Sequence, residues 1–103
     1  MKTGNVDLSE SVVIPKEGFY KPNGRFSSVE LFSADLSAAS IAVELQGSIS
    51  GETWVTLQES GSDISETLTS GVAMFQTFET DPEIKLRLKC GTATGTVNYT
   101  IRE

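Results

Sequence analysis

Strict alternation of apolar and polar residues is the feature that most constrains what this chain can fold into. Residues 84–90 place apolar side chains at every second position, at Ile84, Leu86, Leu88 and Cys90, with a cation at each position between them. Successive side chains of a strand point to opposite faces of a sheet, so this pattern predicts a strand with one buried face. Residues 96–102 and 40–49 repeat the pattern and predict buried faces made of Val97, Tyr99 and Ile101, and of Ile41, Val43, Leu45 and Ile49.

Weaker strand patterns occupy residues 11–15, 26–32, 53–58, 64–68 and 72–78, and turn-forming residues separate them. Only residues 33–39 have room for a helical turn. The chain has 103 residues, which suffices for one domain. The prediction is therefore an all-β fold: a single antiparallel β-sandwich, or jelly-roll-like, domain of about eight strands at residues 11–103, preceded by a polar N-terminal arm at residues 1–10.

Several kinds of catalytic site are excluded by composition. The chain has no histidine and one cysteine, Cys90, so it lacks histidine-based triads, most catalytic zinc sites and disulfide frameworks. Cys90 ends an apolar strand face and is predicted to be a buried structural thiol. The acids Asp63, Glu66, Asp81 and Glu83 fall in or near predicted turns, where they form either a calcium-binding loop cluster or ordinary solvated carboxylates. We expect no enzyme, no cofactor and no resident metal.

Charge is distributed unevenly along the chain. The net charge is −6, which argues against a nucleic-acid partner, yet residues 26–84 hold ten acids and no lysine or arginine. Lys85, Arg87 and Lys89 follow on one face of a predicted strand, roughly 6–7 Å apart. This basic stripe either meets an acidic surface on a neighbouring subunit or shell, or pairs across strands with acids such as Glu44 and Glu79.

Aromatic residues mark a second candidate surface. Trp54, the only tryptophan, begins a predicted strand after a hairpin turn and is expected to anchor the core, with a sugar-stacking platform as the alternative. Phe19 and Tyr20 precede the turn-forming run at residues 21–24 and are predicted to form an exposed aromatic loop. Together with the basic stripe, Phe19 and Tyr20 form the predicted interaction surface.

The sequence contains no recognisable membrane-spanning segment or export signal. The first residues lack an apolar core of the kind that secretory signals carry, and no apolar run approaches the ~20 residues that span a bilayer. The expectation is a protein made in a cytoplasm, with no membrane partner.

The segment 43–57 resembles a known hairpin. It consists of a strand, the run Gly47-Ser48-Ile49-Ser50-Gly51-Glu52-Thr53-Trp54 and a second strand. This resembles the "Gly-Ser-x-(Asp/Ser)-Gly-x-x-Trp" hairpin of small β-sandwich structural proteins of tailed bacteriophages, in which a basic-apolar strand and a Gly-Thr-Gly-type turn follow. Residues 84–88 and 91–97 match those later parts, and Ser50 stands where many such hairpins carry Asp. Similar hairpins also occur in carbohydrate-binding and discoidin-like modules.

The resemblance implies a non-enzymatic component of a phage virion, such as a capsid decoration protein, a head-fibre base or a neck or tail accessory protein. It implies a phage capsid or tail protein as partner, and it carries over no catalytic or ligand residues. Such proteins usually form symmetric homo-oligomers, and a trimer is favoured because a threefold ring could place the basic stripe of one subunit beside the acids of the next. The alternative function is a carbohydrate- or receptor-binding β-sandwich module.

Overall fold

Eleven strands and no helix make up the protein, whose computed structural model describes residues 1–103. The fold therefore holds no helix that could cross a membrane. In chain order the strands are β1 (Lys2–Asp7), β2 (Val13–Ile14), β3 (Phe26–Phe32), β4 (Ser40–Ser48), β5 (Val55–Thr56), β6 (Gln58–Glu59), β7 (Ser62–Asp63), β8 (Ser65–Thr69), β9 (Met74–Glu79), β10 (Lys85–Cys90) and β11 (Thr96–Arg102).

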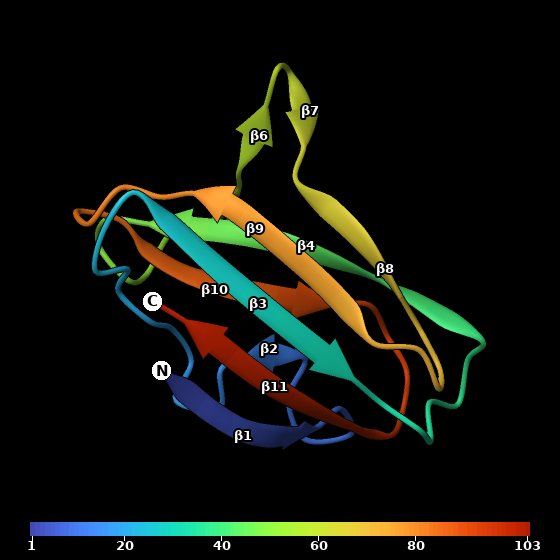
Figure 1. The fold of residues 1–103 in the computed structure, drawn as a ribbon. Helices are drawn as coiled ribbons and strands as arrows, with labels where there is room; N and C mark the ends of the chain where they lie inside the picture. Colours follow the sequence, from blue (N-terminus) through green and yellow to red (C-terminus); the bar gives the residue numbers. More distant parts are fainter.

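The strands form two main antiparallel sheets in a sandwich-like arrangement (Figure 1). The first sheet, here sheet A, has the order β1-β11-β3-β9. The second, sheet B, has the order β2-β10-β4-β5, and β8 also pairs with β4. Because β10 lies in sheet B and β11 in sheet A, the glycine-rich connection at residues 91–95 crosses from one sheet to the other. This all-β architecture agrees with the fold class predicted from the alternation.

The core lies between the two sheets and takes side chains from both. The predicted inward residues of segments 84–90 and 96–102 are buried or packed against the core: Ile84, Leu86, Leu88, Cys90, Val97, Tyr99 and Ile101. From β4 come Ile41, Val43 and Leu45, and sheet A adds Val29 and Leu31. The predicted burial of Ile49 is wrong, because β4 ends at Ser48 and the Ile49 side chain is 79% exposed.

Residues 1–10 are part of the sandwich, so the predicted separate arm is wrong. β1 pairs with β11 along six residues, and Val6 and Leu8 are buried in the core. The inward face of β1 looks polar in the sequence because Gly4 occupies one of its positions. A Cβ atom there would lie only 2.7 Å from the Tyr99 hydroxyl, so glycine is what admits this ring beneath the strand.

A small hairpin formed by β6 and β7 projects from the sandwich (Figure 1). Its two-residue turn has positive φ at both Ser60 (54°) and Gly61 (82°), which is the geometry of a type I′ hairpin turn. All of its strand residues are exposed. With β5, these two-residue strands bring the strand number above the predicted eight. Residues 33–39 form bends rather than the helical turn for which they had room.

Candidate functional site

The three cations of β10 lie on the outer face of sheet B. Alternation along β10 turns Leu86, Leu88 and Cys90 into the core, so Lys85, Arg87 and Lys89 point away from it. None of the three forms an ion pair within the chain, since the only two ion pairs are Met1–Glu103 and Arg25–Glu79. The predicted basic stripe therefore exists as a row of cations without intramolecular acid partners.

Glu44 is one of the two acids that the sequence suggested as ion-pair partners of the basic stripe. It stands opposite Lys89 in the β4–β10 register, but no Lys89–Glu44 ion pair forms. The Glu44 carboxylate instead accepts a hydrogen bond from the Thr56 hydroxyl at 3.1 Å. Glu79, the other acid suggested as a partner, lies 3.8 Å from Arg25. Lys89 thus has an acid opposite it in the register but forms no ion pair, while Lys85 and Arg87 have no acid opposite them.

Arg87 is the most constrained cation of the row. Its Nε–H donates a hydrogen bond of 2.8 Å to Oε1 of Gln46, the residue opposite in β4. Its guanidinium carbon lies 4.2 Å from the centre of the Trp54 ring, which is a cation–π contact. Partial burial lowers the pKa of Arg87 from its usual range, and an arginine so placed stays charged at neutral pH. The terminal nitrogens make no hydrogen bond within the chain and remain available to a ligand.

Phe19 and Lys85 extend this arrangement. The Phe19 and Trp54 ring centroids are 6.5 Å apart with a tilt of 43°, and the Lys85 ammonium lies 5.5 Å from the Phe19 centroid. We name the surface made by Phe19, Gln46, Trp54, Lys85 and Arg87 the cation–aromatic face. Its members come from the loop before β3, from β4, from the β4–β5 loop and from β10.

The loop between β4 and β5 holds Trp54 in this position. The Ser50 hydroxyl accepts hydrogen bonds from the backbone N–H groups of Glu52 and Thr53, and the Ser48 hydroxyl accepts one from Gly51. The Trp54 indole N–H donates to the Gly51 carbonyl at 3.3 Å. Trp54 is consequently half-buried against Arg87 and Phe19 and takes no part in the core, so the prediction of a core anchor is wrong.

Tyr20 does not belong to this surface, which corrects the predicted exposed pair. Phe19 is 40% exposed, but Tyr20 is only 1% exposed. The Tyr20 hydroxyl lies 2.9 Å from the Ser27 hydroxyl, and its backbone pairs with Leu86. Burial raises the pKa of Tyr20 to about 12. Neighbouring residues of an extended segment point in opposite directions, so only one of the two rings could face solvent.

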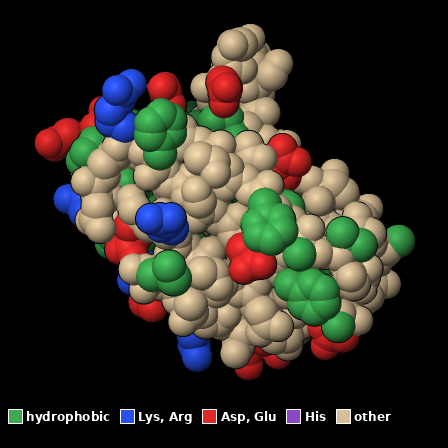
Figure 2. Space-filling model, in the orientation of Figure 1, with side chains coloured by type: hydrophobic (Ala, Val, Ile, Leu, Met, Phe, Trp, Pro, Cys, Tyr) green, Lys and Arg blue, Asp and Glu red, His purple; other side chains and the backbone are tan.

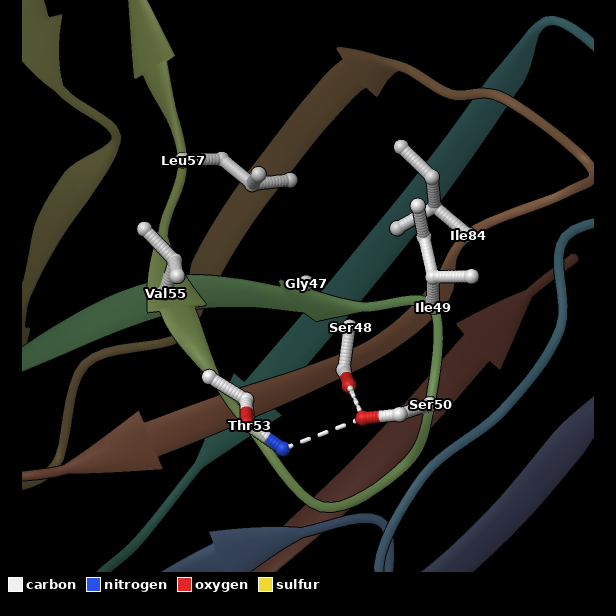
Figure 3. A pocket seen from close by; sticks show the side chains of 8 residues that line it. All are labelled: Gly47, Ser48, Ile49, Ser50, Thr53, Val55, Leu57 and Ile84. Atoms are coloured by element: carbon white, nitrogen blue, oxygen red, sulfur yellow. Dashed lines mark hydrogen bonds between the residues drawn. The ribbon is translucent and has the colours of Figure 1, made fainter.

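An apolar groove lies beside the cation–aromatic face, on the other side of the β4–β5 loop (Figure 3). It encloses about 410 Å³ and is lined mainly by Ile49, Val55, Leu57 and Ile84. Its floor is Gly47, where a Cβ atom would lie 2.9 Å from Ile84 Cγ2. The alternation did not reveal this groove, because its lining comes from the end of β4, the β4–β5 loop, residues 55–57 and Ile84, which only the folded chain brings together.

The outer face of sheet A is less organised. Phe26, Phe32 and Phe75 are exposed there, and Phe75 stands opposite Glu30 in the register. Figure 2 shows several hydrophobic side chains close together on this face, with charged and polar atoms around them. Exposed apolar side chains are ordinary on protein surfaces, and nothing in the structure indicates a ligand or partner for these.

The predicted acidic loop cluster does not assemble. Asp63 accepts a hydrogen bond from the Gln58 amide, and Asp81 accepts one from the backbone N–H of Glu83. No group of three or more carboxylate or cysteine side chains lies close enough to hold a metal ion. Cys90 is buried, and burial raises the pKa of its thiol to about 12, which suppresses the reactive thiolate.

Comparisons with protein-family models, with curated proteins and with solved structures found no match to this chain.

Proposed function

We propose that this chain is a non-enzymatic structural protein of a tailed-phage virion, either a capsid decoration protein or a head or tail accessory protein. One observation carries the proposal: Lys85, Arg87 and Lys89 form a row of cations on the outer face of sheet B with no intramolecular ion pair, and Lys85 and Arg87 lie against Phe19 and Trp54. Arginine and aromatic side chains are enriched at the centres of protein interfaces. The resemblance of the β4–β5 hairpin to those of phage structural proteins supports the same assignment.

We further infer that the fold is a jelly roll. Two four-stranded sheets with the orders β1-β11-β3-β9 and β2-β10-β4-β8 support this inference. In each sheet, strands from the first half of the chain alternate with strands from the second half: β1 and β3 alternate with β11 and β9, and β2 and β4 alternate with β10 and β8. Two interlocked Greek keys give this arrangement. In this view β5, β6 and β7 are an insertion between β4 and β8, which leaves the eight strands of the jelly roll itself.

The proposed partners are a phage capsid or tail protein and further copies of this chain, with a trimer favoured. An acidic surface on either partner would complement the cations. The proposed location is the virion, after synthesis in the host cytoplasm. The absence of histidine and the high pKa of the buried Cys90 thiol support a role in binding rather than in catalysis.

Mass spectrometry of purified phage particles tests the assignment. The chain is expected in stoichiometric amounts in the particle, and its absence there would refute the proposal. Cosedimentation of the purified protein with particles that lack it supplies a second readout. Arg87→Gln should weaken cosedimentation, whereas Arg102→Gln, which removes the same charge from the outer face of sheet A, should not.

A carbohydrate-binding function is the second candidate. Two neighbouring aromatic rings, Phe19 and the half-buried Trp54, favour it, because sugars stack on such rings. Against it, Arg87 already covers one face of the Trp54 ring. Titration of Trp54 fluorescence with a panel of neutral oligosaccharides tests this alternative, which predicts saturable binding that Phe19→Ala removes.

A further inference from the structure

We propose that the cation–aromatic face binds the acidic β6–β7 hairpin of a second copy of this chain. This inference rests on the self-association part of the proposed function and not on the virion assignment. It assigns a carboxylate as the ligand of Arg87 and the hairpin acid Glu59 as its principal source.

The receiving site is built for a carboxylate. Gln46 holds the Arg87 Nε–H and Trp54 lies against the guanidinium, so the side chain is already oriented before any ligand arrives. The free terminal nitrogens can donate two parallel hydrogen bonds to one carboxylate. Lys85 stands two positions away on the same face and adds a second positive charge. The partly desolvated guanidinium has no acid partner in its own chain.

The hairpin has the complementary properties. It projects from the sandwich, and all four of its strand residues are exposed, so it contributes nothing to the core of its own subunit (Figure 1). Glu59 and Asp63 lie on it, Glu66 follows it, and residues 26–84 contain no cation. Asp63 is engaged by the Gln58 amide, whereas the Glu59 carboxylate makes no hydrogen bond or ion pair within the chain.

The two surfaces must meet between copies rather than within one. No ion pair joins the hairpin acids to Lys85, Arg87 or Lys89 of the same chain. A contact between two different patches is head-to-tail, and such contacts close into rings when the rotation between neighbours permits. Each copy then offers one hairpin and one cation–aromatic face, which agrees with the cyclic trimer proposed above.

Charge reversal on each side, followed by mixing, tests the inference. Sedimentation velocity at low salt should show wild-type oligomers that dissociate at high salt, because screening weakens exposed ion pairs. Arg87→Glu and Glu59→Lys should each raise the dissociation constant by about tenfold or more, because like charges then face each other. Arg102→Glu and Glu30→Lys, on the outer face of sheet A, are the matched controls and should associate like wild type.

Mixing Arg87→Glu with Glu59→Lys restores opposite charges at every contact between the two variants, so mixed pairs should form. A ring of three keeps one contact between like variants, so mixing is expected to restore pairs and not the closed trimer. Native mass spectrometry should then find complexes that contain both. Circular dichroism and thermal midpoints should show that each variant is folded, since the replaced residues lie outside the core.

Three outcomes would overturn the inference: a wild-type monomer at all concentrations and low salt, equal effects of the control variants, or loss of association that mixing does not restore. Particle binding that depends on Arg87 in a strictly monomeric protein would assign the site to another protein instead. Oligomers of a chain that is absent from phage particles would refute the virion assignment and leave this site intact.

Discussion

Replacing Ser27 with alanine removes the centre of a buried hydrogen-bond chain that joins three parts of the fold. The Ser27 hydroxyl donates to the backbone carbonyl of Arg102 in β11 at 2.9 Å. A serine hydroxyl carries one hydrogen, so the Tyr20 hydroxyl must be the donor in the 2.9 Å contact with Ser27. The chain Tyr20–Ser27–Arg102 thus ties the loop before β3 to both β3 and β11. Tyr20 and Ser27 are each 1% exposed, so water cannot replace either partner.

The expected cost follows from which groups are left without partners. Tyr20→Phe removes a donor but leaves Ser27 bonded to Arg102, and should lower the free energy of unfolding by about 1 kcal/mol. Ser27→Ala leaves the buried Tyr20 hydroxyl and the Arg102 carbonyl without this partner, and should cost about 2–3 kcal/mol. The double variant should cost less than the sum of the two, because it no longer contains the unpaired hydroxyl.

Urea denaturation followed by circular dichroism measures the four free energies of the cycle. For a domain of this size, 1 kcal/mol also moves the thermal midpoint by about 4 °C or more. Both measurements should give the same order of decreasing stability: wild type, then Tyr20→Phe, then Ser27→Ala. A Ser27→Ala variant as stable as Tyr20→Phe, or costs that simply add, would refute the hydrogen-bond chain as the source of stability.

Three further predictions concern packing and ionisation. Gly47→Ala should lower the free energy of unfolding by about 1–3 kcal/mol, because the new methyl group would lie 2.9 Å from Ile84 and 3.1 Å from Leu57. Urea titrations measure this change, and an unchanged midpoint would contradict the packing. The contribution of Tyr20 and Cys90 to stability should be constant below about pH 9 and should fall as the pH rises toward 12, because their folded-state pKa values, both about 12, exceed the ordinary values of 10.0 and 9.0. In urea titrations at alkaline pH, Tyr20→Phe should reduce that fall. Cys90 should resist a thiol-specific chromogenic reagent at pH 8 until denaturant is added, and rapid native labelling would contradict its burial.

The part of the fold that could be predicted follows from local pattern. A period of two places alternate side chains on opposite faces whatever the rest of the chain does, so the buried faces of β10 and β11 and the cation row of β10 were predictable. The turn around Gly51 likewise depends on residues close to it in the sequence, so it was predictable too. Alternation says nothing about which strands pair, so the sequence left the two sheets and their order open.

The tertiary structure alone decided what the cations touch. Arg87 meets Gln46 because β10 pairs with β4 in one particular register, and meets Trp54 because the β4–β5 loop folds back over that face. Phe19 reaches the same place from a loop far away in the sequence. Local sequence pattern also could not predict that Ile49 is exposed or that β1 belongs to sheet A. Both depend on where neighbouring strands begin and end, which is a property of the packed sheets and not of any single segment.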